Sequence, residues 1–232
     1  MDKKIIEILA KNDKYCSHGD TVNYADPPKV FENCDGSFLF DENKTPYLDW
    51  QMWYSAVNFG YKNKRIADVL HKQVDALPQL ASQYLHKEKV DLAEVICKYM
   101  EEKYGVKGRV HFNVGGAQAV EDSLKVVRNH TGKTHQFAFM GGYHGRTFYT
   151  MAMNGKVAPY QTDFGPMPGT VFRAPYPVPY HGVSEDEAIR GLKMTLKTDA
   201  NPKDTAAIIL EPVLGEGGFY PAPTSFLKKI RE

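Results

Sequence analysis

The chain has 232 residues, which is enough for one large domain or for a large domain with a small one. Its 29 basic and 28 acidic residues are well mixed, give a formal net charge of +1 and form no basic stripe, so a nucleic-acid partner is not expected. Apolar residues make up 42% of the chain, which indicates a folded core rather than disorder.

Cysteine usage and the first residues indicate the compartment. Cys16, Cys34 and Cys97 are scattered and lack the spacing of metal ligands, which favours reduced thiols. The stretch 1–14 is charged and amphipathic, without the long apolar core of a signal peptide. No apolar run approaches the length that spans a membrane. We therefore expect a soluble, cytoplasmic protein without membrane contact.

The first 60 residues predict an N-terminal arm followed by a small meander. A short helix is expected over 3–12, and an irregular stretch rich in Asp, Asn, Pro and Tyr leads to residue 28. The Asp35-Gly36 pair between two alternating runs is a strong hairpin signal. The expected strands are residues 30–34, 37–40 and 47–50.

From residue 61 to 232, helical and strand-like patterns alternate, which predicts an α/β sheet with helices on both faces. The expected helices lie at 66–77, at 92–104 and at 184–197. The expected strands lie at 109–112, 136–140, 171–173 and 206–210. The segment 205–210 is apolar almost throughout, as in a strand covered on both faces.

Two further stretches stand out in this second part. Residues 154–183 carry many Pro, Gly and Tyr and predict a long ordered loop of functional type. At the end, residues 225–232 begin a helix that Thr224 or Ser225 would cap, and no C-cap closes it. We therefore expect a chain cut within an element.

The stretch 112–128 (FNVGGAQAVEDSLKVVR) predicts a strand that turns through Gly115-Gly116 into an amphipathic helix. Such a turn offers free backbone N–H groups at the positive end of a helix, where a phosphate is stabilised. The dinucleotide and P-loop fingerprints are both absent, so a nucleotide-binding Rossmann domain is disfavoured. Two more glycine-containing turns follow strand-like runs, at 141–147 and 211–218.

With these three turns in view, the sequence resembles the class III aminotransferases, pyridoxal 5'-phosphate (PLP) enzymes of fold type I, over about residues 15–232. Within that family it is most similar to the ornithine aminotransferase type. The resemblance is carried by Tyr54-Ser55-Ala56-Val57-Asn58-x-Gly60, by Gly-Tyr-His-Gly-Arg-Thr ending at Thr147, and by Glu-Pro-x-x-Gly-Glu-Gly-Gly at 211–218. It implies a mixed, mostly parallel large-domain sheet, of which 61–232 would be the first part.

The resemblance implies a cofactor role for six residues. The backbone amides of Gly116 and Ala117 would bind the PLP phosphate, next to Gly115, where the family usually has Ser. Tyr143 would stack on the pyridine ring, since a flat, electron-poor ring gains from an aromatic face. His144 would be a supporting or structural residue, and Glu211 would be a carboxylate near the cofactor. Without the flanking motif, Tyr143 would be better read as a core or loop aromatic.

Four residues would contact substrate by the same resemblance. Arg146 matches an arginine that grips a substrate carboxylate through its planar fork, although a structural ion pair is the alternative. Tyr24 and Tyr54 match positions that line the substrate pocket, or are packing residues in a tyrosine-rich chain. Glu216 matches a glutamate that pairs with a second arginine, which would lie beyond residue 232.

The resemblance further implies a Schiff-base lysine and an aspartate facing the pyridine nitrogen, both C-terminal to the Glu-Pro strand. This chain does not contain those segments, and Lys156, Lys228 and Lys229 are poor substitutes. We therefore expect an N-terminal portion that performs no transamination alone. A fragment of this kind should show poor solubility or association, because it would expose apolar faces.

The function expected by resemblance is transfer of an amino group from an ω-amino or diamino acid, such as ornithine or lysine, to a 2-oxo acid. A PLP-dependent amino-acid racemase or epimerase of the same family and a non-catalytic scaffold protein are the alternatives. The complete protein would be a homodimer, and no metal is expected.

Overall fold

The computed structural model describes residues 3–17 and 25–232. The chain divides into two compact units, Met1–Asp91 and Leu92–Glu232, and each is considered by itself. The division falls within helix α3 (Lys87–Tyr104). The domain boundary expected near residue 60 stays a prediction. None of the helices in the described ranges is both long and apolar enough to cross a membrane.

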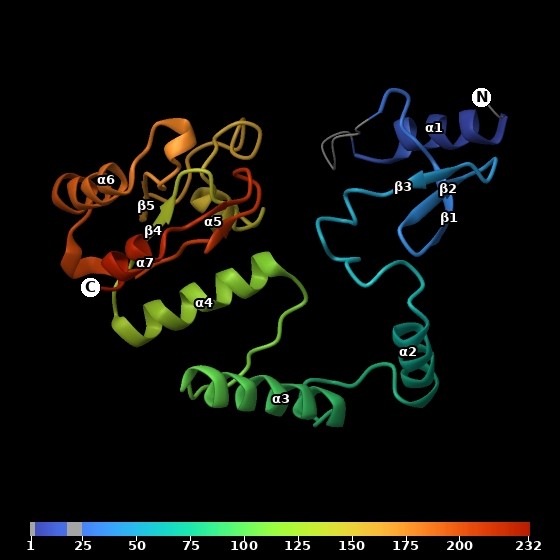
Figure 1. Cartoon of the computed structure of the whole chain (residues 1–232), viewed down its shortest axis with the longest axis horizontal. Helices are drawn as coiled ribbons and strands as arrows, with labels where there is room; N and C mark the ends of the chain where they lie inside the picture. The colour runs from blue at the N-terminus through green and yellow to red at the C-terminus, as the bar shows by residue number, and fades with distance from the viewer. Residues whose placement is uncertain (1–2, 18–24) are drawn as a thin grey trace. The chain divides into compact units, whose positions relative to one another are not determined.

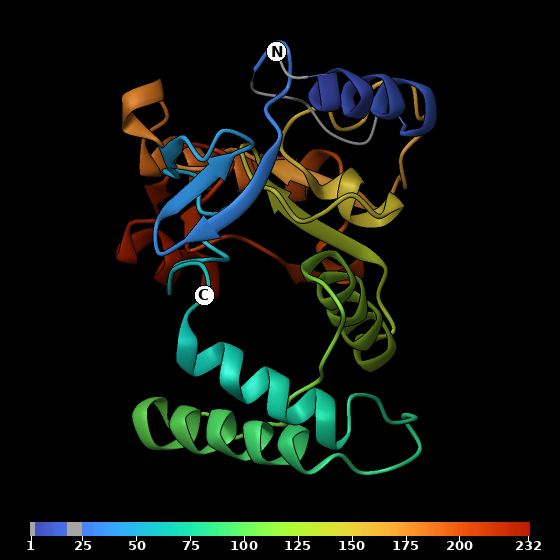
Figure 2. The ribbon, with the colours of Figure 1, turned by 90° about the vertical axis from the view of Figure 1, so that its right-hand side faces the viewer.

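The first unit begins with the helix and the small meander that the sequence predicts for residues 1–60, and helix α2 follows them. Helix α1 (Lys3–Tyr15) precedes an antiparallel meander of β1 (Phe31–Asp35), β2 (Phe38–Asp41) and β3 (Pro46–Leu48), and β1 and β2 lie side by side in Figure 2. Gly36 turns the first hairpin with a φ of +53°, which suits glycine. Helix α2 (Lys64–Ala76) begins after Asn63, whose side chain accepts the N–H of Ile66.

The second unit has a parallel three-stranded sheet in the order β5-β4-β6 (Figure 1). Its strands are β4 (His135–Phe139), β5 (Val171–Ala174) and β6 (Thr205–Ile208). Two short strands, β7 (Val213–Leu214) and β8 (Tyr220–Pro221), form an antiparallel pair. The helices are α4 (Gly116–Thr131), α5 (Phe148–Met153), α6 (Glu185–Thr198) and α7 (Thr224–Arg231), with 3₁₀ turns at Pro179–His181 and Pro202–Asp204.

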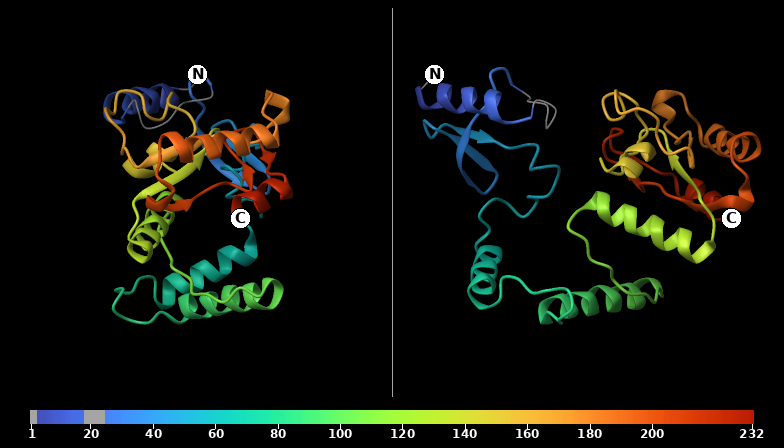
Figure 3. Two further views of the ribbon diagram at one scale, coloured as in Figure 1. Left: turned by 90° about the vertical axis from the view of Figure 1, so that its left-hand side faces the viewer. Right: turned by 180° about the vertical axis from the view of Figure 1, so that it is seen from behind.

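Alternation along β4 separates two apolar cores. Phe137 and Phe139 face one side, where they pack with residues of α6 and α7, including Phe226. Ala138 faces the other side, where it packs with Leu124 of α4 and Met153 of α5. Helices therefore cover both faces of the sheet, with β4 between α4 and α6 (Figure 3), as the sequence predicts.

Two local expectations are wrong, and a third holds in part. Residues 109–112 form no strand, because no neighbouring strand pairs with them. The segment 205–210 is covered on both faces, since Ile208 and Ile209 pack against opposite cores, although β6 is an edge strand and only half-buried. Helix α7 starts after Pro223 without a side-chain cap, and the Ser225 hydroxyl instead donates to Glu185 at 2.5 Å.

Candidate functional site

The N-terminus of α4 forms one wall of the candidate site. Gly115 precedes the helix in an extended conformation (φ −169°, ψ 163°), and no side chain caps the first turn. The amides of Gly116 and Ala117 therefore have no acceptor within the helix and lie at its positive end. A Cβ at Gly115 or Gly116 would meet nothing within 4 Å, so the backbone is open to a ligand.

An open pocket of about 540 Å³ joins this helix end to the loop at 141–147. Residues expected to bind the cofactor's phosphate, its ring and a substrate carboxylate therefore line the same pocket of the second unit. The residues lining the pocket are Gly116, Ala117, Val120, Tyr143, His144, Gly145 and Arg146.

Gly145 lets the loop approach α4 closely. Its φ is +134°, and a Cβ there would lie 2.5 Å from the Ala117 Cβ and 2.7 Å from the Thr150 hydroxyl. Only glycine fits such a position without displacing its neighbours. The buried Asn154 secures the same loop, because its Oδ1 accepts the His144 N–H at 2.7 Å and its Nδ2 donates to the Gly145 carbonyl at 2.9 Å.

Tyr143 lies between three other side chains at the pocket. Its backbone N–H donates to Glu211 Oε1 at 2.6 Å, and its hydroxyl accepts from Arg146 Nε at 3.2 Å. The edge of the Tyr160 ring meets its ring at a centroid distance of 5.3 Å and an interplanar angle of 61°. These contacts orient the aromatic ring for which the resemblance implies a stacking role.

Glu211 joins two glycine-containing turns and is not among the residues lining the pocket. Each carboxylate oxygen accepts one backbone N–H: Oε1 from Tyr143 at 2.6 Å and Oε2 from Gly215 at 2.8 Å. Its backbone carbonyl accepts the Tyr176 hydroxyl at 3.0 Å. Both carboxylate oxygens are therefore engaged in holding the two loops.

His144 contributes a nitrogen that the chain leaves unpaired. The side chain is only 8% exposed, and Nε2 is buried without a hydrogen-bond partner. Burial lowers the pKa of His144, and the nearby charge of Glu211 opposes this to a lesser degree. The lowered pKa favours the neutral imidazole near pH 7. Nε2 itself lies beneath the surface on the side of Gly142, where an added Cβ would approach it to 3.3 Å.

Glu216 belongs to a charged cluster with Lys156 and Tyr160. Its Oε1 accepts the Tyr160 hydroxyl at 2.7 Å and Lys156 Nζ at 3.2 Å. The Tyr160 hydrogen bond holds the pKa of Glu216 below its ordinary value, and Lys156 acts in the same direction. Burial, followed by the bond to Glu216, raises the pKa of Tyr160 to about 12.

Sequence reasoning missed Asn154 and Tyr160. Asn154 precedes Gly155 at the end of α5, and such a pair signals only a turn. Tyr160 lies in the long loop at 154–183 without a recognisable motif around it. The length and composition of that loop, which predict a functional loop, are the sequence signal that could have indicated Tyr160.

Two predicted substrate residues cannot be assigned to the pocket. Tyr24 lies outside the described residues. Tyr54 belongs to the first unit, where its side chain is 72% exposed. It lies in a run of four left-handed residues, 52–55, with φ of 46°, 46°, 53° and 70°. Both residues remain predictions.

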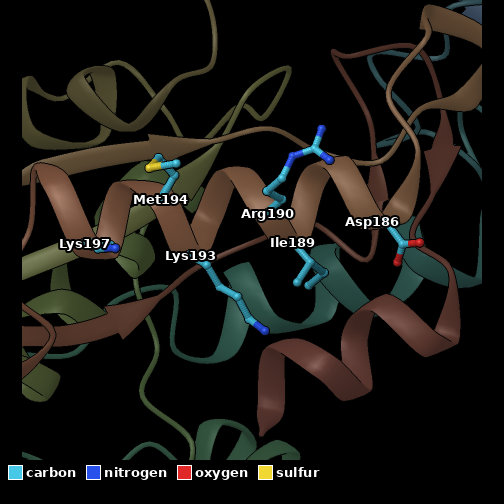
Figure 4. A pocket seen from close by; sticks show the side chains of 6 residues that line it. All are labelled: Asp186, Ile189, Arg190, Lys193, Met194 and Lys197. Atoms are coloured by element: carbon cyan, nitrogen blue, oxygen red, sulfur yellow. The ribbon is translucent and has the colours of Figure 1, made fainter.

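A second hollow is built differently. Figure 4 shows its lining side chains along α6 alone, spread over the exposed face of the helix. No loop or glycine turn contributes to it, so its groups do not converge. The lining residues are Asp186, Ile189, Arg190, Lys193, Met194 and Lys197.

The sequence pattern of the family "Aminotransferase class-III" matches residues 21–232, and the chain belongs to that family. It is 38% identical over 205 residues to the 5-aminovalerate aminotransferase DavT of Pseudomonas aeruginosa, which covers 88% of this chain and 48% of that protein. It is 38% identical over 201 residues to the 4-aminobutyrate aminotransferase GabT of Escherichia coli (86% and 46%). An acetylornithine aminotransferase of Streptomyces clavuligerus is 31% identical (90% and 47%). The chain spans about half the length of the curated relatives it matches.

Solved structures share the fold. An aminotransferase of Bacillus anthracis superposes with a TM-score of 0.86 at 25% identity, covering 100% of this chain and 53% of that one. A taurine:2-oxoglutarate aminotransferase of Bifidobacterium kashiwanohense, solved with PLP and glutamate, gives 0.86 at 22% identity (97% and 52%). The expected fold type I architecture is therefore confirmed.

Proposed function

We propose that this chain supplies the phosphate-binding and ring-stacking half of a PLP site in a class III aminotransferase. The observation that carries the proposal is one pocket lined by Gly116, Ala117, Tyr143 and Arg146. Backbone N–H groups without acceptors at a helix N-terminus can bind the cofactor's phosphate, and an oriented aromatic ring can stack on its heterocycle.

The complete reaction that we propose is transfer of an amino group from an ω-amino donor to a 2-oxo acid. When bound, PLP supplies the electron sink that such chemistry needs. In this chain, Gly116 and Ala117 would bind the phosphate, Tyr143 would orient the ring, and Arg146 would bind a substrate carboxylate through charge-assisted hydrogen bonds. Glu216 would hold a negative charge near Arg146 and set which substrates enter.

The relatives' names support the donor class. They act on 5-aminovalerate, 4-aminobutyrate and acetylornithine, all of which carry an amino group far from a carboxylate. Ornithine or lysine as donor belongs to the same proposal, as do a homodimeric assembly and a cytoplasmic location. No contact in the described chain favours racemisation over transfer.

Binding of the cofactor to the chain tests the phosphate site directly. In ¹⁵N-labelled protein, PLP and inorganic phosphate should both shift the amide resonances of Gly116 and Ala117, whereas pyridoxal without phosphate should not. Gly116→Pro removes one donor at the first helical position, where proline is tolerated and the preceding extended Gly115 is compatible. We expect PLP to bind at least about 10-fold more weakly, because one hydrogen bond to a charged group is worth about 1.5–3 kcal/mol.

Gly116→Ala is the matched control, since it keeps the N–H and a Cβ there meets nothing within 4 Å. It should bind PLP within about twofold of the wild type, as expected for a surface change. PLP that shifts neither amide, or that binds Gly116→Pro as well as the wild type, contradicts the proposed site.

A further inference from the structure

Tyr160 connects Tyr143 and Glu216, for which the resemblance implies different tasks. Its ring meets the Tyr143 ring edge-on at 5.3 Å, and its hydroxyl donates to Glu216 Oε1 at 2.7 Å. The residue lies 17 positions from Tyr143 and 56 from Glu216 in the chain. Nothing in the glycine-containing motifs indicates this role.

Glu216 also has a cationic partner within the chain. Lys156 Nζ lies 3.2 Å from the same Oε1 that Tyr160 contacts, and Arg146 is close enough to influence the charge of the carboxylate. Two donors on one oxygen fix the carboxylate more firmly than a lone exposed ion pair would. An external cation that approaches Glu216 therefore competes with Lys156.

We propose that Tyr160 is a positioning residue of the substrate site: its ring edge fixes the plane of Tyr143, and its hydroxyl, together with Lys156, fixes the carboxylate of Glu216. This proposal refines the proposed function and rests on it, because the pocket is a substrate site only if the chain contributes to an aminotransferase. The chemical consequence concerns specificity. A fixed anion within the electrostatic reach of Arg146, which lines the pocket, would repel a second substrate carboxylate and favour a substrate that has one.

The test of the hydroxyl needs no cofactor. The ¹³C-labelled side-chain carboxyl of Glu216, assigned with Glu216→Gln, is titrated by NMR in the whole chain. Tyr160→Phe should raise the pKa of Glu216 toward its ordinary value, and Lys156→Met should raise it less, because the tyrosine bond contributes most. Tyr149→Phe, which removes a hydroxyl bound to Thr170 at 2.6 Å in the same unit, should leave the pKa unchanged. A Glu216 titration that is identical in Tyr160→Phe and Tyr149→Phe overturns the proposal.

The test of the ring uses PLP as the probe. Tyr160→Phe keeps the ring edge and should bind PLP within about twofold of the wild type, whereas Tyr160→Leu should bind about 3- to 10-fold more weakly, as expected for one lost aromatic pair. Equal affinities for Tyr160→Leu and Tyr160→Phe overturn the part that concerns Tyr143. Wild-type protein that binds no PLP would contradict the proposed function instead, and the Glu216 titration would still decide the role of the hydroxyl.

Discussion

The two units of the chain differ in how far they bury their own apolar residues. In the described part of the first unit, 3–17 and 25–91, only Ile5 is buried. In the second unit two cores lie on opposite faces of the parallel sheet. Helix α2 has a clear apolar stripe, yet Leu70 and Val74 on it are 58% and 60% exposed. An amphipathic pattern thus predicts a helix correctly without showing what covers its apolar face.

The largest effect that would sharpen this comparison is expected at Phe226. Its ring is fully buried against Phe139 and Tyr176, at centroid distances of 5.7 and 5.9 Å. Phe226→Ala should lower the free energy of unfolding of the second unit by about 3–5 kcal/mol. Amide hydrogen exchange of β4 and β5 would measure it. Leu70→Ala in α2, at an exposed position, should change stability by less than about 0.5 kcal/mol. Similar losses for both variants would remove the distinction between the units.

A smaller effect is expected at the helix caps. Ser184 and Glu187 form a reciprocal capping box at the start of α6, so Ser184→Ala should cost about 1 kcal/mol in guanidinium unfolding. Asn63 caps α2 through one long bond of 3.4 Å to the Ile66 N–H. Asn63→Ala should therefore cost about 0.5 kcal/mol, the low end for such changes. An Asn63→Ala loss that exceeds the Ser184→Ala loss would reverse the expected order.

The smallest effect concerns pH in the first unit. The Tyr61 hydroxyl donates to Asp49 at 2.7 Å, which lowers the pKa of Asp49 and raises the pKa of Tyr61 to about 12. Stabilisation by this pair is thus fully present between the ordinary values of 3.8 and 10.0, and is lost as pH falls through the Asp49 pKa or rises through the Tyr61 pKa.

Tyr61→Phe removes that hydrogen bond, and its stability is compared with that of the wild type at each pH. Its stability should fall below that of the wild type by less than about 1 kcal/mol at pH 7, since the pair is only partly buried. The difference should vanish in strong acid and strong base in unfolding titrations. A difference that persists unchanged in acid would show that Asp49 is not involved.

Local patterns predict most elements and motifs because their signals lie within a few residues. The hairpin at Asp35-Gly36 and the helix that begins at Gly116 are examples. The prediction of a strand at 109–112 is wrong because a strand needs a partner strand, and a local pattern does not show whether one lies beside it. Asn154 and Tyr160 were missed for a related reason: their contacts connect separate loops, and only the folded chain brings those loops together.

The two backbone hydrogen bonds that Glu211 accepts have a consequence for motion at the pocket. One carboxylate restrains the backbone of Tyr143 and that of Gly215, which precedes Glu216, so neither turn shifts without disturbing the other. A rearrangement that moves Glu216 toward a new counter-ion would therefore also move Tyr143. With the roles that we propose for these two residues, entry of the substrate and orientation of the cofactor would be coupled.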